Sequence, residues 1–411
     1  MRPLLARTAA LTAALSLGAA PGLGAPRVPG ARPAVATPEG GLWDLSDKAE
    51  VQARQSAELE TSPELNAYVR GVVCKVAPEY CGELRLYVLD RPYFNAAMAP
   101  NGYVEVWTGL LLRVDDEAEL AFVLGHEASH FAQNHSLAAH EALKNRANMG
   151  LILAAGIGAA GVAAAASAPS AQSANSILRS TGDVAEIAYI GTLLSIFSFT
   201  REQEAEADQL GFKRAVAAGY RPSAGADLWR KVMAETSASD FDKVRKSEAQ
   251  LSIFADHPAS ATRLAALQAQ AAEVKTAGES GAERLRAAIR PHLAAWLKSD
   301  LRRRDYGETL YLLDHLAGYG QDLGVINFYR GEAYRLRRAE GDLALAAKAY
   351  AAAGAYDDAP PAAWRELGEM RRRDHDADGA RQAYQLYLAK APTADDAWMV
   401  QDSILSLAKG N

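Results

Sequence analysis

The stretch His126-Glu127-Ala128-Ser129-His130 decides how the rest of this chain is interpreted. The apolar run before it predicts a helix, and residues four apart in a helix lie about 40° from each other on one face. Both imidazoles can then point at one metal ion, and Glu127, about 100° from His126, can reach a water on that ion. A five-residue motif can also occur by chance, so the surrounding sequence must provide the other residues of a metal site.

A further metal ligand is predicted in Arg201-Glu-Gln-Glu204-Ala-Glu-Ala-Asp208, because a catalytic zinc usually has three protein ligands. Arg201, Glu204 and Asp208 share one face of a predicted helix, whereas Glu202 and Glu206 are expected to turn away. One carboxylate can bind the metal while the other orients a ligand imidazole. The alternative is an ordinary charged helix face made of i,i+4 ion pairs.

His135 and His140 follow the histidine pair, but neither is expected to join the site. If one long helix continues toward Met149, His135 lies about 180° around from the first histidine of the pair. His140 is then displaced by about 15 Å along the axis from the second. We predict that both are surface groups on the solvated face of an amphipathic helix.

The segments around these residues resemble the M48 family of zinc metallopeptidases. In chain order they are Asn95 to Leu110, Glu117 to Gly125, His126-Glu-x-x-His130, Arg201-x-x-Glu204-x-x-Ala-Asp208, and His257-Pro258 with Arg263. The resemblance covers about Ser46 to Gln270. It implies a zincin-like domain in which His126, His130 and Glu204 hold Zn²⁺, Glu127 is the general base and Asp208 supports the site.

His257 has two explanations. In a periplasmic type of M48 peptidase that also carries helical repeats, a histidine in this segment can occupy the free zinc position and keep the enzyme inactive. The resemblance therefore implies that His257 is a resting-state ligand, which would have to leave before water could attack. A plain histidine beside the helix-starting Pro258 is an equally weighted alternative.

Composition limits the classes of protein to consider. The 411 residues are 49% hydrophobic and 23% charged, which excludes disorder along the whole chain. The net charge of -6 provides no basic field for a phosphate backbone, so no nucleic-acid partner is expected.

Residues 1–25 follow the order of a secretory signal peptide: two arginines, an uncharged run rich in Ala and Leu, and then small residues. A disordered Ala-rich tail is the alternative. We expect export to the periplasm, followed by a linker over the Pro- and Gly-rich residues 26–45. Export permits a disulfide between Cys74 and Cys81, although two unlinked buried thiols fit nearly as well.

Residues 46–275 are predicted to form the peptidase domain, mainly α with a small β-sheet (α+β). A helix is expected to begin at Ser46, and alternating residues predict strands near Leu84 to Val88 and Tyr103 to Trp107. The region Asn95 to Val106 either offers an edge strand to an extended substrate or forms a plain hairpin.

A long stretch without charge, Ala147 to Leu178, separates the two halves of the predicted site. A membrane hairpin is disfavoured, because the only return segment has about fourteen uncharged residues where about twenty are needed. For residues 150–170 we favour a lid beside the cleft or a peripheral membrane contact.

Residues 280–411 are predicted to form a helical domain with tetratricopeptide-like repeats. Tyr350 and Tyr384 are 34 residues apart, as are Trp364 and Trp398. The offset breaks between Gly331 and Gly368. An ordinary helical bundle is the alternative. Stacked helix pairs present a concave surface for protein partners.

Together these features predict an exported zinc endopeptidase. By resemblance, its substrates are unfolded or misassembled envelope proteins, and its repeats dock substrates or an outer-membrane assembly machine. A periplasmic chaperone or assembly-binding module with a latent peptidase is the alternative function.

Overall fold

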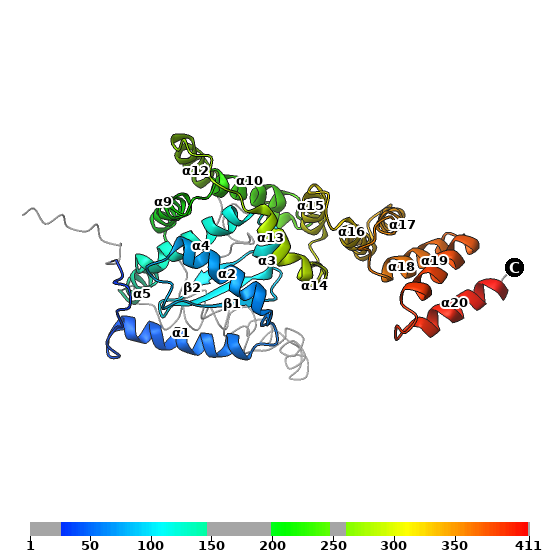
Figure 1. Cartoon of the computed structure of the whole chain (residues 1–411), viewed down its shortest axis with the longest axis horizontal. Coiled ribbons are helices and arrows are strands. Elements are labelled where there is room, and N and C mark those ends of the chain that lie inside the picture. The colour runs from blue at the N-terminus through cyan, green and yellow to red at the C-terminus, as the bar shows by residue number, and fades with distance from the viewer. Residues whose placement is uncertain (1–25, 146–198, 247–259, 410–411) are drawn as a thin grey trace, which may run out of the picture.

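The computed structural model describes residues 26–145, 199–246 and 260–409, and within them the chain is mostly helical with one small sheet, as predicted (Figure 1). The predicted signal peptide, the uncharged residues 150–170 and His257 lie outside the described residues. Among the helices that the structure describes, none combines the length and apolar character needed to cross a membrane.

The first described part contains the sheet and the helices around it. Its elements are α1 (Pro38–Gln55), α2 (Pro63–Val76), β1 (Arg85–Leu89), β2 (Ala96–Met98), β3 (Tyr103–Trp107), α3 (Thr108–Arg113), α4 (Glu117–Ala132) and α5 (His135–Asn145). The strands expected from alternating residues are confirmed as β1 and β3. The short strand β2 lies in the region Asn95 to Val106, for which an edge strand or a plain hairpin was predicted, and it forms an antiparallel hairpin with β3.

The sheet has the order β1-β3-β2, with β1 parallel to β3 and β2 antiparallel to it. Side chains alternate between its two faces. Val104 and Val106 belong to the core shared with α2 and α4, whereas Tyr103 packs with Leu42 of α1 on the other face. The sheet is therefore buried between α1 on one side and α2 with α4 on the other, and β2 is one of its edges (Figure 1).

The predicted start of the first helix at Ser46 is wrong. Helix α1 begins at Pro38, where the Thr37 side chain accepts a hydrogen bond from the Gly40 backbone, and proline suits a first helical turn. Ser46 lies inside the helix and donates to the carbonyl of Leu42. Proline and glycine at 38–41 open a helix here rather than continue a linker.

The helices from residue 199 onward pack first against the part that contains the sheet and then lead into an extended helical region. They are α9 (Arg201–Ala217), α10 (Ala224–Ser237), α11 (Asp242–Lys246), α12 (Ala261–Glu273), α13 (Ala282–Ile289), α14 (Leu293–Asp300) and α15 (Tyr306–Ala317). Buried Arg113 of α3 binds Glu235 of α10 and Asp300 of α14, each at 2.8 Å. This fully buried cluster joins α3, next to the sheet, to α10 and α14.

The C-terminal region extends away from the sheet as a row of packed helices (Figure 1). They are α16 (Leu323–Arg337), α17 (Asp342–Ala353), α18 (Ala362–Arg373), α19 (Ala377–Lys390) and α20 (Ala397–Lys409). The same contact occurs twice. The Tyr350 ring packs on Gly331 and its hydroxyl binds Glu332, and the Tyr384 ring packs on Gly368 with its hydroxyl on Glu369.

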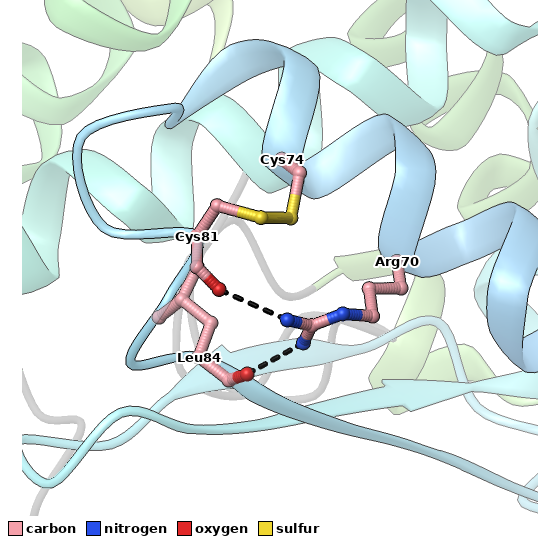
Figure 2. Close-up of a disulfide and its surroundings, with 4 residues drawn as sticks. All are labelled: Arg70, Cys74, Cys81 and Leu84. Carbon is pink, nitrogen blue, oxygen red and sulfur yellow. Dashed lines mark hydrogen bonds between the residues drawn. A yellow bond between two sulfur atoms is a disulfide. The ribbon is translucent and has the colours of Figure 1, made fainter.

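Cys74 and Cys81 form a disulfide that links the end of α2 to the turn before β1 (Figure 2). The structure thus selects one of the two alternatives that the sequence left open. Figure 2 also shows Arg70 of α2 donating to the carbonyls of Cys81, at 3.0 Å, and Leu84, at 2.6 Å. These contacts fix the turn that starts the sheet.

Candidate metal centre

Helix α4 carries the first half of the site. The Asp116 side chain accepts a hydrogen bond from the Glu119 backbone and caps the start of the helix. Every residue of α4 is buried, which suits a helix with packing partners on all sides. His126 and His130 stand one turn apart, and their Nε2 atoms approach to 3.0 Å.

Helix α9 carries the second half and begins with a capping box between Thr200 and Gln203. It crosses α4 where Gly125 and Gly211 bring the two backbones together. The crossing brings buried Glu204 to 3.6 Å from Nε2 of both His126 and His130. The two segments that the sequence singled out therefore meet at one point.

The donor atoms fit a single metal ion. The ligand atoms of His126, His130 and Glu204 all lie within 4.8 Å of one another, and the three residues are buried. Ligands at about 2.05 Å around a tetrahedral ion are about 3.3 Å apart, close to the spacings observed here. Two imidazoles and one carboxylate are a donor set that suits a borderline divalent ion such as zinc.

Asp208 orients His126. Its Oδ1 lies 3.1 Å from Nδ1 of His126, and Arg263 binds the same carboxylate at 2.7 and 2.8 Å. Burial alone would raise the pKa of Asp208, but the bonds from Arg263 and His126 outweigh it and hold the pKa below its ordinary value. An ionised carboxylate only accepts hydrogen bonds, so Nδ1 of His126 carries the proton and Nε2 offers its lone pair.

In the sequence, Arg263 of α12 is identified only as part of the segment from His257-Pro258 that resembles the family, and no contact is predicted for its side chain. In the structure its guanidinium also lies 2.9 Å from Glu204, so one arginine binds both predicted carboxylates. It stacks over the ring of Trp229 of α10 at 4.8 Å. Its local sequence gives no sign of this role, because the partners lie on elements far away in the chain.

The prediction that His135 is a surface group is wrong. Helix α4 ends at Ala132, and Asn134 adopts a left-handed conformation with φ 53°, so the chain turns before α5 begins. The turn buries His135 completely and brings its Nδ1 to 2.9 Å from Nδ1 of His130. Burial lowers the pKa of the His135 imidazole, and Glu206 opposes this effect. His140 is half-buried on α5.

Glu206 also departs from expectation. It was predicted to turn away from the site, yet its Oε2 lies 3.2 Å from Nε2 of His135. His135, the first residue of α5, reaches the face of α9 that carries Glu206. Glu202 is exposed, as predicted.

Glu127 is buried beside the histidines and lines a small cavity with His126, Phe122 and Trp229. The cavity has a volume of about 10 Å³, which is near the smallest that holds one water molecule. Its wall also includes Asn95 and Ala96, at the start of the edge strand β2. A carboxylate, a potential metal site and the sheet edge thus meet at one cavity.

Comparisons with known proteins agree with this geometry. A family model described as peptidase family M48 matches residues 61–271. The beta-barrel assembly-enhancing protease of Escherichia coli (strain K12) is 26% identical over 217 residues, which cover 52% of this chain and 40% of that protein. The mitochondrial metalloendopeptidase OMA1 of Bos taurus is 30% identical over 151 residues, which cover 36% of this chain and 26% of that protein.

The chain spans less than half the length of these curated relatives. The family match itself extends over half of the chain and contains both helices that carry the clustered donor atoms. The chain belongs to peptidase family M48.

Proposed function

We propose that the protein is a zinc-dependent endopeptidase that hydrolyses peptide bonds in unfolded or misassembled proteins. One observation carries the proposal: two imidazoles and a carboxylate from separate helices converge in a buried cluster next to Glu127 and a cavity. Membership of peptidase family M48 supports the same activity.

In the proposed mechanism, His126, His130 and Glu204 hold the zinc ion. When bound, zinc supplies Lewis-acid chemistry that polarises a peptide carbonyl and makes water more acidic. Glu127 takes the proton of the attacking water and passes it to the departing amine. Asp208, fixed by Arg263, keeps His126 in the tautomer that binds the metal.

The edge strand β2 is the proposed track for the substrate. It pairs with β3 on one side only within the three-stranded sheet, and its first residue lines the cavity at Glu127. An extended peptide could add to this edge through main-chain hydrogen bonds once the contacts that bury the three residues of β2 open. Phe122 and Trp229 would then present apolar surface beside the cleaved bond, because both line the cavity at Glu127.

We further propose that the protein acts in the periplasm on envelope proteins. The support is the signal-like sequence of residues 1–25 and the similarity to proteases named for β-barrel assembly. The twice-repeated glycine–tyrosine–glutamate contact favours tetratricopeptide-like repeats over an irregular bundle. Such repeats would dock substrates or an outer-membrane assembly machine.

His257 is retained as a proposed resting-state ligand on the strength of its sequence context. If it occupies the free metal position, His257→Ala raises the rate of proteolysis. An unchanged or lower rate at full metal occupancy would reject this regulation and leave the peptidase proposal intact.

The test of the main proposal combines metal analysis with cleavage of an unfolded protein. The purified full chain should contain about one zinc per molecule, and a chelator should abolish cleavage. Glu127→Gln should keep the metal and lower cleavage by at least about 100-fold, while exposed Glu202→Gln should match the wild type. Absence of metal, or full activity of Glu127→Gln, refutes the proposal. Equal protection of a client by Glu127→Gln without any wild-type cleavage would select the chaperone alternative.

A further inference from the structure

The proposed mechanism gives no role to His135, although this buried side chain contacts the cluster of His126, His130 and Glu204. Its side chain lies between a metal-site histidine and a carboxylate. Nδ1 of His135 is 2.9 Å from Nδ1 of His130, and Nε2 of His135 is 3.2 Å from Oε2 of Glu206. Both distances are those of hydrogen bonds.

The number of protons fixes the direction of both bonds. The Glu206 carboxylate accepts, so Nε2 of His135 carries a hydrogen. A neutral imidazole has only one N–H, and Nδ1 of His135 is therefore an acceptor. Two facing nitrogens at 2.9 Å share one proton, which must then belong to Nδ1 of His130. When an ion is bound, Nε2 of His130 can then offer it a lone pair, as can Nε2 of His126, which lies 3.0 Å away. Oε1 of Glu204 lies 3.6 Å from Nε2 of His130.

We propose that His135 and Glu206 are positioning residues that hold His130 in its metal-binding tautomer. Asp208 has the same task for His126, so each imidazole of the cluster has its own support. This inference rests on the proposed function, because it assumes that His126, His130 and Glu204 bind the metal.

The ring stack on Phe199 cannot replace this support. The rings of His130 and Phe199 lie 3.8 Å apart and only 18° from parallel, which fixes the plane of the imidazole. A stack does not distinguish between the two ring nitrogens, because it involves the face of the ring and not its edge. The hydrogen bond from His130 to His135 makes that distinction. His135 itself is not a candidate ligand, because its two nitrogens face His130 and Glu206.

The experiment measures metal affinity of the full-length protein rather than activity alone. Apo protein is titrated with Zn²⁺ in competition with a chelator, and with Co²⁺ to record the visible spectrum of the bound ion. His135→Leu fills the space without an acceptor, whereas His135→Asn can place its Oδ1 near the position of Nδ1. The matched control is His292→Leu, because His292 also pairs with a carboxylate, Glu60.

We expect His135→Leu to weaken Zn²⁺ binding by about 10 to 100-fold and to change the Co²⁺ spectrum. His135→Asn should recover most of the affinity, and His292→Leu should bind as the wild type. Glu206→Gln should lower affinity less than His135→Leu, and Glu202→Gln should not lower it.

Two results overturn the inference: wild-type metal affinity and spectrum in His135→Leu, or equal losses in His135→Leu and His135→Asn, which would indicate packing alone. Thermal unfolding of each apo variant separates loss of the site from loss of the fold. A wild-type chain that binds no metal would instead refute the proposed function.

Discussion

Replacing Gly211 by alanine tests whether close contact between α4 and α9 builds the site. A Cβ at Gly211 would lie 2.7 Å from the backbone nitrogen of His126 and 2.9 Å from its Cα. Ordinary contact begins at 3.4 Å, so the helices must separate by about 0.7 Å. Both obstructing atoms belong to the backbone of α4, and no side-chain rotation can relieve the contact.

The displacement should reach the metal donors. Glu204 lies two turns before Gly211 on the same helix face, and a rigid α9 would carry it away from the histidines. Metal sites tolerate deviations of only about 0.2 Å in ligand distance. We expect Gly211→Ala to lower zinc affinity by at least about 10-fold, the minimum typical of a disturbed supporting residue.

Stability should change in a different way. Overpacking costs about 1 to 3 kcal/mol, and alanine in a helix recovers about 0.5 to 1 kcal/mol relative to glycine. The apo protein should therefore lose up to about 2.5 kcal/mol of unfolding free energy. Gly71→Ala on α2 is the matched control, because no atom lies within 4 Å of the added Cβ. Gly125→Ala, with its nearest contact at 3.1 Å, should be intermediate.

The assay is zinc competition with a chelator, together with denaturant unfolding of the apo proteins. Zinc affinity should be highest in Gly71→Ala, intermediate in Gly125→Ala and lowest in Gly211→Ala. Wild-type zinc affinity in Gly211→Ala, with a stability gain equal to that of Gly71→Ala, would refute the claim that this crossing sets the ligand geometry.

Three further outcomes are expected. Asp300→Asn should lower the free energy of unfolding by about 3 to 5 kcal/mol in denaturant, because it removes one of the charge partners of buried Arg113. The control Asp314→Asn, at an exposed ion pair with Arg330, should lower it by less than about 1 kcal/mol. Burial would raise the pKa of Asp300, but Arg113 and the other partners of this carboxylate hold its pKa below the ordinary value. The ionised Asp300 therefore stabilises the fold fully above about pH 4, and this stabilisation is lost as the pH falls through the pKa of the folded state. Unfolding at pH 7 and pH 3 should therefore show a smaller difference between wild type and Asp300→Asn at pH 3, and an undiminished difference would contradict this. Replacing Cys74 and Cys81 by serine should lower stability by about 2 kcal/mol through loss of a short loop constraint, and a reductant should then have no added effect on thermal unfolding.

The sequence was most informative where the chemistry follows from helical spacing. The four-residue intervals of His126 to His130 and Glu204 to Asp208 fix which side chains share a helix face, and no tertiary knowledge is needed for that step. Alternation likewise located β1 and β3. The pattern fails for β2, because its three residues are too short to show a period and all are buried.

Residue chemistry and helical spacing in the sequence were enough to identify the donor types and the helix faces that carry them. Three features could be seen only in the folded chain: α4 and α9 touch at Gly125 and Gly211, Arg263 binds both carboxylates of α9, and His135 is buried. The first two join elements that are far apart in the chain, and local spacing carries no information about such contacts. For His135 the cause is the turn at Asn134: one residue in a left-handed conformation redirects the chain, so helical spacing no longer predicts where the next side chain points.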